Sequence, residues 1–233
     1  MKIRTLILIL IIAFISIYAM QEVTYFATKE VNTNNFNGST LVIPKINLTE
    51  QLYDSLDKGV LFTEGSSEPS KGTVLLQGHR TFLGSPFLRL DELIVGDNLS
   101  ILCPGIGKVN YVVDNKHIEN PDYRIVLNDK NNTKLYMSTC HPLGFTTQRL
   151  IIDSSFVNVE PLVDAKTIVD YNIYIIIIIL GVFIIGSIIS YFYPVKKDRK
   201  FLFAEIIIIT LILIGLFIHP IPLNYFSFLG QLF

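Results

Sequence analysis

The sequence predicts an all-β domain together with three transmembrane helices. Hydrophobic residues make up 50% of the 233-residue chain, and they are concentrated in three long apolar runs. Between the first and second runs lie short β-branched stretches bounded by Gly, Pro, Asn and Asp. An apolar helix of about 20 residues crosses a bilayer, and short β-branched runs between turn residues are typical of a β-sandwich or barrel.

The three apolar runs cover residues 5–20, 173–193 and 201–218. The first is short enough to be a cleaved signal peptide. Cleavage after Ala19 would leave Ile17 where a small residue is preferred, so we favour an uncleaved signal anchor. The other possibility, that these runs are buried helices of a soluble protein, conflicts with the 21 uncharged residues of the second run.

Basic residues predict the orientation of the chain. Those outside residues 21–170 form two clusters: Lys2 and Arg4, then Lys196, Lys197, Arg199 and Lys200. Because Lys and Arg are enriched on the cytoplasmic side, we expect both clusters inside the cell and residues 21–170 outside. That region has 13 Lys and Arg against 18 Asp and Glu, a net charge of −5. Nucleic acid is therefore not an expected partner, because it binds basic surfaces.

These features predict the domain organisation. We expect an anchor over 1–20, an Asn-rich polar spacer over 21–40, an extracellular domain over 41–160, a linker over 161–172, spans over 173–193 and 201–219, a basic cytoplasmic loop over 194–200 and an outer tail over 220–233. Within the domain, strands are expected at 73–76, 99–102, 109–113, 134–139 and 150–152, with brief helices near 51–58 and 85–93.

Three polar residues at the ends of predicted strands suggest a chemical site. Cys140 ends the run from Lys134, Arg149 follows nine residues later, and His79 ends another apolar run. A cysteine attacks as its thiolate, and a nearby His and Arg can favour or select that form. One Cys, one His and one Arg can therefore form a cysteine acyl-transfer site.

The motifs between residues 41 and 156 resemble those of the sortase family, in the family's order. They are the opening strand 41–46, Glu64-Gly65, the Gly-His-Arg segment ending at Arg80, the Phe-Leu-Leu-Gly-Asp pattern over 87–97, Tyr136-Met-Ser-Thr-Cys140 in place of Thr-Leu-x-Thr-Cys, and Arg149. Each motif alone is weak, but six in order are specific. The resemblance implies a closed β-barrel of about eight strands with short helices.

The resemblance also implies roles for these residues. Cys140 would be the nucleophile, His79 the general acid and base, and Arg149 a stabiliser of the oxyanion or the substrate. Arginine stays protonated, so Arg149 can act only electrostatically. Thr139 is expected to shape the pocket beside the nucleophile.

By the same resemblance, the substrate is a surface protein with a C-terminal LPxTG-like sorting signal. The acceptor is an amine on a cell-wall component or a pilin Lys. The three apolar runs separately predict a multi-pass protein of the cell membrane in contact with lipid. No cofactor is expected, and the two distant cysteines lack the spacing of a zinc site. A thiol peptidase that transfers nothing and a non-catalytic binding module are the alternatives.

Other residues compete with these assignments. A disulfide between Cys103 and Cys140 would block the nucleophile, so we expect Cys103 to be a packing residue. His141 neighbours Cys140 and should point to the opposite face of its strand. His117 is expected in a solvated connection. The subclass stays open, because Cys-His-Pro at 140–142 is similar to classes D and E, whereas C-terminal spans are similar to class C, whose lid motif is not found in residues 21–40.

Overall fold

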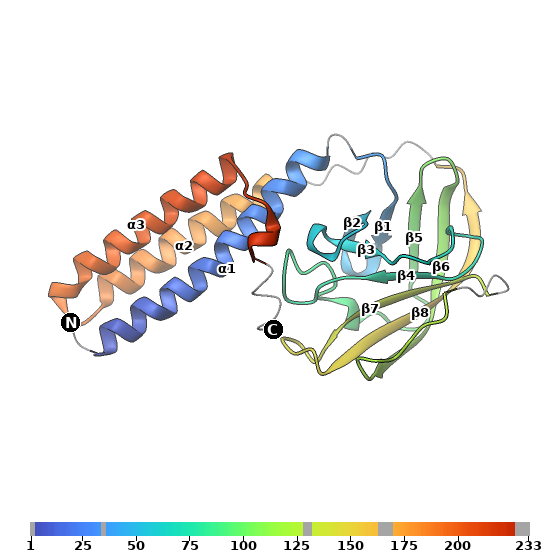
Figure 1. The fold of residues 1–233 in the computed structure, drawn as a ribbon, viewed down its shortest axis with the longest axis horizontal. Helices are drawn as coiled ribbons and strands as arrows, with labels where there is room; N and C mark the ends of the chain where they lie inside the picture. Colours follow the sequence, from blue (N-terminus) through green and yellow to red (C-terminus); the bar gives the residue numbers. More distant parts are fainter. Residues whose placement is uncertain (1–2, 34–35, 128–131, 163–169, 227–233) are drawn as a thin grey trace. The chain divides into compact units, whose positions relative to one another are not determined.

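The computed structural model describes residues 3–33, 36–127, 132–162 and 170–226. They form two compact units (Figure 1): a helical unit built from the two ends of the chain, and a β-barrel unit over Phe36–Val169.

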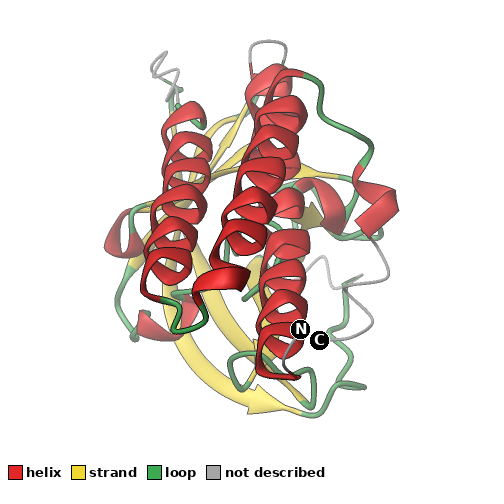
Figure 2. Ribbon diagram, turned by 90° about the vertical axis from the view of Figure 1, so that its left-hand side faces the viewer, coloured by secondary structure: helices red, strands yellow, loops and turns green. Residues whose placement is uncertain are grey.

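The helical unit contains three long helices: α1 (Ile3–Thr33), α2 (Asn172–Phe192) and α3 (Lys196–Ile218). Each helix packs against the other two, and Figure 2 shows them running side by side. A Cβ added to Gly186 of α2 would lie 2.4 Å from Ile206 of α3, so this glycine permits the close approach of the two helices. All three helices are long and apolar enough to cross a membrane.

Two predicted boundaries in this unit are wrong. The polar spacer expected over 21–40 is helical as far as Thr33, because Val23 and Ala27 continue the buried apolar face of α1. The basic loop expected over 194–200 is helical from Lys196. Only the break at Pro194 remains of that loop, since a residue before proline is disfavoured in a helix. The expected linker 161–172 and tail 220–233 lie partly outside the described residues.

The barrel unit is all-β, as predicted. Its strands are β1 (Thr40–Ile43), β2 (Leu48–Tyr53), β3 (Val60–Phe62), β4 (Val74–Gln77), β5 (Asn98–Cys103), β6 (Gly107–Glu119), β7 (Lys134–His141) and β8 (Gln148–Glu160). They close in the order β1-β2-β3-β4-β7-β8-β6-β5. The core is formed by apolar side chains that alternate along the strands, among them Leu41, Ile43, Leu76, Ile101, Val109, Leu135, Met137 and Ile152.

The two helices expected in the barrel are much shorter than predicted. Residues 51–53 of the first segment, 51–58, belong to β2, and only η2 (Leu56–Lys58) is a short 3-10 helix. Likewise η3 (Leu90–Glu92) is the helical part of 85–93. Leu52 of the first segment and Phe87, Leu90 and Leu93 of the second are buried in the barrel core, so packing in the closed barrel decides their conformation.

The register around β7 positions the site. β4 and β7 are parallel and pair from Val74 with Leu135 to Gln77 with Ser138. β8 pairs antiparallel with the other edge of β7, as far as His141 with Gln148. The carboxyl ends of β4 and β7 therefore meet beside the start of β8.

Candidate active site

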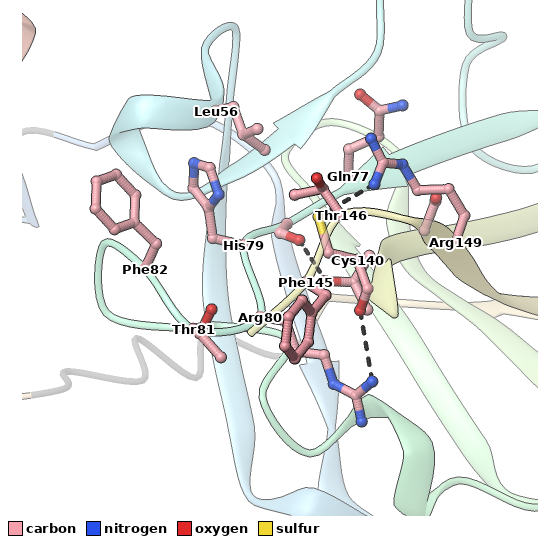
Figure 3. Close-up of a pocket in the computed structure, with 13 residues that line it drawn as sticks. Leu56, Gln77, His79, Arg80, Thr81, Phe82, Cys140, Phe145, Thr146 and Arg149 are labelled. Carbon is pink, nitrogen blue, oxygen red and sulfur yellow. Dashed lines mark hydrogen bonds between the residues drawn. The ribbon is translucent and has the colours of Figure 1, made fainter. Parts of the chain in front are cut away.

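A pocket of about 260 Å³ opens where β4 and β7 end. Its lining comes from four segments: Leu56; Gln77, Gly78, His79, Arg80, Thr81 and Phe82; Ser138, Thr139 and Cys140; and Phe145, Thr146 and Arg149. All four residues predicted for the site, His79, Thr139, Cys140 and Arg149, are in this lining. Figure 3 shows Cys140 lying between His79 and Arg149.

Cys140 reaches the pocket because of the alternation along β7. Leu135, Met137 and Thr139 are buried toward the barrel interior. Cys140 has the opposite orientation and is half-buried, with a free thiol. The strand thus supplies core residues and an accessible sulfur from alternate positions.

Arg149 is the direct cross-strand partner of Cys140. Opposed residues of an antiparallel pair project to the same face with their Cβ atoms about 5 Å apart. Arg149 Nη1 donates a hydrogen bond to Cys140 Sγ over 3.2 Å. A permanent positive charge therefore lies against the sulfur.

His79 lies two residues beyond Gln77, the last β4 residue that pairs with β7. Cys140 likewise lies two residues beyond Ser138, the last β7 residue that pairs with β4. Its ring meets that of Phe82 edge to face at 5.4 Å. Burial lowers the pKa of His79, and the carboxylate of Asp57 opposes this more weakly. Nε2 is buried with no hydrogen-bond partner among the described residues. The ring is thus neutral at pH 7 and can accept a proton.

Gly78 and Thr139 hold the two strand ends together. Gly78 N donates to the Ser138 carbonyl over 3.2 Å, and Thr139 Oγ1 donates to the Gly78 carbonyl over 2.7 Å. A Cβ at residue 78 would lie 2.6 Å from the ring of Phe87, which requires glycine there. Thr139 is buried, so it shapes the pocket wall with its hydroxyl already bound.

The competing residues lie apart from this arrangement. Cys103 is buried, and burial raises the pKa of its thiol; both cysteines are free, without the disulfide considered above. His141 is not in the pocket lining. His117 lies within β6 rather than in the expected connection, and its Nδ1 is 3.5 Å from Asp153 Oδ1.

Arg80 is the residue that sequence reasoning missed. It belongs to the Gly-His-Arg motif, but no role followed from the motif alone. Its side chain is 5% exposed and forms an ion pair with Asp91 over 2.9 Å. The sequence signal was an arginine directly after the histidine. Its burial depends on how the strands pair, which the local sequence does not specify.

No metal site accompanies the pocket in the described part of the chain, where no group of three or more His, Cys, Asp or Glu is arranged to hold a metal ion. The chemistry available to the pocket is that of a sulfur nucleophile, a neutral imidazole and a fixed cation. This combination suits acyl transfer through a covalent intermediate.

A family model for the sortase domain matches residues 38–157, which is more than half of the chain. The chain belongs to the sortase family. Its closed barrel is the fold expected of a sortase. No curated protein matches the chain.

Solved sortases with similar folds include proteins of different types. Streptococcus agalactiae sortase C1 is 28% identical over 55% of this chain and 69% of its own, with a TM-score of 0.48. Corynebacterium diphtheriae sortase A is 21% identical over 53% of this chain and 62% of its own, also at 0.48. The match therefore spans less than two thirds of that sortase A.

Proposed function

We propose that this sortase is a membrane-anchored transpeptidase that cleaves an LPxTG-like sorting signal through a thioacyl-enzyme and transfers the cargo protein to an amine on the cell surface. The observation that carries the proposal is the contact between Arg149 and the sulfur of Cys140, in one pocket with His79. The site residues predicted from the sequence thus belong to a single cavity, although they are up to 70 residues apart in the chain.

The first half-reaction forms the thioester. His79, neutral because of its burial, takes the proton of the Cys140 thiol as the sulfur attacks the scissile carbonyl. The carbonyl oxygen becomes an oxyanion, and the resulting imidazolium then protonates the departing amine. The C–N bond breaks, and the cargo is held on Cys140 as a thioester.

The second half-reaction releases the cargo. The incoming amine gives a proton to His79 as its nitrogen attacks the thioester, and the sulfur leaves. A new amide bond forms, so no external energy source is needed. If water attacks in place of the amine, the same groups act as a thiol peptidase.

Arg149 acts on charge in both halves. It is a donor with five N–H groups, of which one already contacts Sγ. As negative charge moves from sulfur to the carbonyl oxygen, the same guanidinium can stabilise the oxyanion. Thr139 has a positioning role at the pocket wall, because its hydroxyl binds the Gly78 carbonyl.

The helical unit supports the membrane location. With the basic clusters inside the cell, the barrel lies outside, where surface proteins carrying sorting signals are processed. We propose that α2 and α3 help to fix the barrel above the membrane. Deleting residues 172–233 while keeping α1 should then reduce attachment of cargo in cells, and unchanged attachment would contradict this role.

A peptide assay on the full chain in detergent tests the proposed function. A fluorogenic LPxTG-type peptide is incubated with and without an amine such as triglycine. We expect ligated product that depends on the amine, is abolished in Cys140→Ala and is retained in Cys103→Ala, the control at the other cysteine. Cleavage indifferent to the amine would favour the thiol peptidase. Peptide binding without turnover would favour the binding module.

A further inference from the structure

Arg80 is the buried cation of the pocket that the proposed reaction leaves without a role. An arginine is almost never buried without partners, and Arg80 has three. Nη2 pairs with Asp91 Oδ2 over 2.9 Å, while Nη1 lies 3.0 Å from His141 Nδ1 and 3.4 Å from the Cys140 carbonyl oxygen.

The distances rank these contacts. Those to Asp91 and His141 are of ordinary hydrogen-bond length, whereas 3.4 Å to the carbonyl is long and therefore weak. A guanidinium can only donate, so His141 Nδ1 must accept. Through this contact Arg80 fixes the orientation of the residue that follows the nucleophile.

The positions of Arg80 and His141 in the chain show which segments their contact connects. Arg80 directly follows His79, and His141 directly follows Cys140. The parallel pairing of β4 and β7 ends at Gln77 and Ser138, so the chain beyond it needs other connections. One guanidinium bridges the two segments beyond that point. Figure 3 shows Arg149 and Arg80 on opposite sides of Cys140, with Arg149 bonded to its sulfur and Arg80 to its carbonyl.

We propose that Arg80 is a positioning residue that clamps the segment carrying Cys140 to the segment carrying His79, acting through the His141 imidazole and the Cys140 carbonyl. Asp91, in η3, holds the guanidinium in place. The inference rests on the proposed function, because its purpose is to align the nucleophile with the acid and base. A misplacement of reacting groups by about 1 Å can cost a factor of about 100 in rate.

The matched variants are Arg80→Gln, Arg80→Lys and Asp91→Asn, with Arg89→Gln as the control. Arg89 also pairs with a carboxylate of its own segment, Glu92, but it contacts neither Cys140 nor His141. The full chain is assayed in detergent with the LPxTG-type peptide. We expect Arg80→Gln to lower kcat about 10- to 100-fold, the effect of losing hydrogen bonds from a charged group, with KM nearly unchanged.

The other variants separate positioning from folding. Arg80→Lys should retain an intermediate kcat, because a single ammonium cannot reproduce the fork. Asp91→Asn keeps Arg80, and the side chain of residue 91 is half-exposed, so this variant should fold normally. Its kcat should fall less than that of Arg80→Gln. His141→Ala should add little further loss in the Arg80→Gln background, since both changes remove the same contact.

Hydrogen exchange of the backbone amides of residues 139–141 provides a readout that needs no substrate. Arg80→Gln should speed exchange there relative to the wild type, and Arg89→Gln should not. Wild-type kcat in Arg80→Gln and Asp91→Asn, or unchanged exchange in Arg80→Gln, would overturn the clamp. A wild-type chain that turns over no peptide would instead contradict the proposed function, and the exchange experiment would still test the clamp.

Discussion

Arg149 is the residue whose charge the proposed chemistry uses most directly, because its guanidinium touches the nucleophilic sulfur. Arg149→Ala should lower the single-turnover rate of acylation about 100- to 1,000-fold, the loss typical of an oxyanion donor. Arg149→Lys should have an acylation rate between those of the wild type and Arg149→Ala, since lysine keeps the charge but not the planar guanidinium. The exposed Arg124, outside the pocket lining, provides the control Arg124→Gln. Near wild-type acylation in Arg149→Ala would remove the residue from the mechanism.

The buried imidazole of His79 predicts a pH dependence of stability. Burial lowers its pKa, so as the pH falls below about 6.5 the unfolded chain binds a proton before the folded one does. Protonation of the unfolded state then favours unfolding. The melting temperature of the wild type should therefore fall more between pH 7.5 and 5.5 than that of His79→Gln.

The comparison is internally controlled. The chain has four histidines, and the other three are present in both proteins, so their contributions cancel. Equal losses of melting temperature in the two proteins would contradict a lowered pKa at His79.

At the scale of elements, the turn after β4 depends on a contact that only glycine allows. Gly78→Ala should destabilise the barrel by about 1–3 kcal/mol, the cost of overpacking, because the new methyl overlaps the buried ring of Phe87. Chemical denaturation of the full chain in mild detergent measures it. Phe87→Leu combined with Gly78→Ala should recover part of the loss, and a double variant less stable than Gly78→Ala would contradict the overlap.

Strands with a clear apolar pattern could be predicted from the sequence, and those without one could not. β4, β5 and β7 were expected because each joins β-branched or leucine residues between turn residues. β2 was missed because Thr49, Glu50 and Gln51 are polar and only half-buried, so pairing with β1 and β3 decides its conformation.

The candidate site shows the same division. Cys140, His79 and Arg149 could be named because their residue types and order carry chemical information. The contact between Cys140 and Arg149 depends on the register of β7 and β8, and the burial of Arg80 depends on packing against η3. Neither follows from local sequence, because each joins segments that meet only when the barrel closes.

At the scale of the whole molecule, the two basic clusters predict the orientation in the membrane. Single cysteines can report it in a Cys103→Ala, Cys140→Ala background. Glu64→Cys, in the barrel unit, should react with a membrane-impermeant maleimide in intact cells. Lys197→Cys, at the start of α3, should react only after permeabilisation. Both positions are exposed, so accessibility within the protein does not distinguish them.

The reverse labelling pattern would place the barrel in the cytoplasm and remove the proposed substrates from its reach. Labelling of both positions in intact cells would place Lys197 outside the cell. It would contradict a hairpin of α2 and α3 whose basic turn lies in the cytoplasm.

The most direct test of the central claim is the intact mass of the full chain after incubation with an LPxTG-type peptide and no amine. We predict an added mass equal to the acyl fragment of the peptide, mapped to Cys140 after proteolysis and removed on addition of triglycine. The adduct should be absent in Cys140→Ala and present in Cys103→Ala. Peptide cleavage that continues in Cys140→Ala, or an adduct on Cys103 alone, would contradict the account.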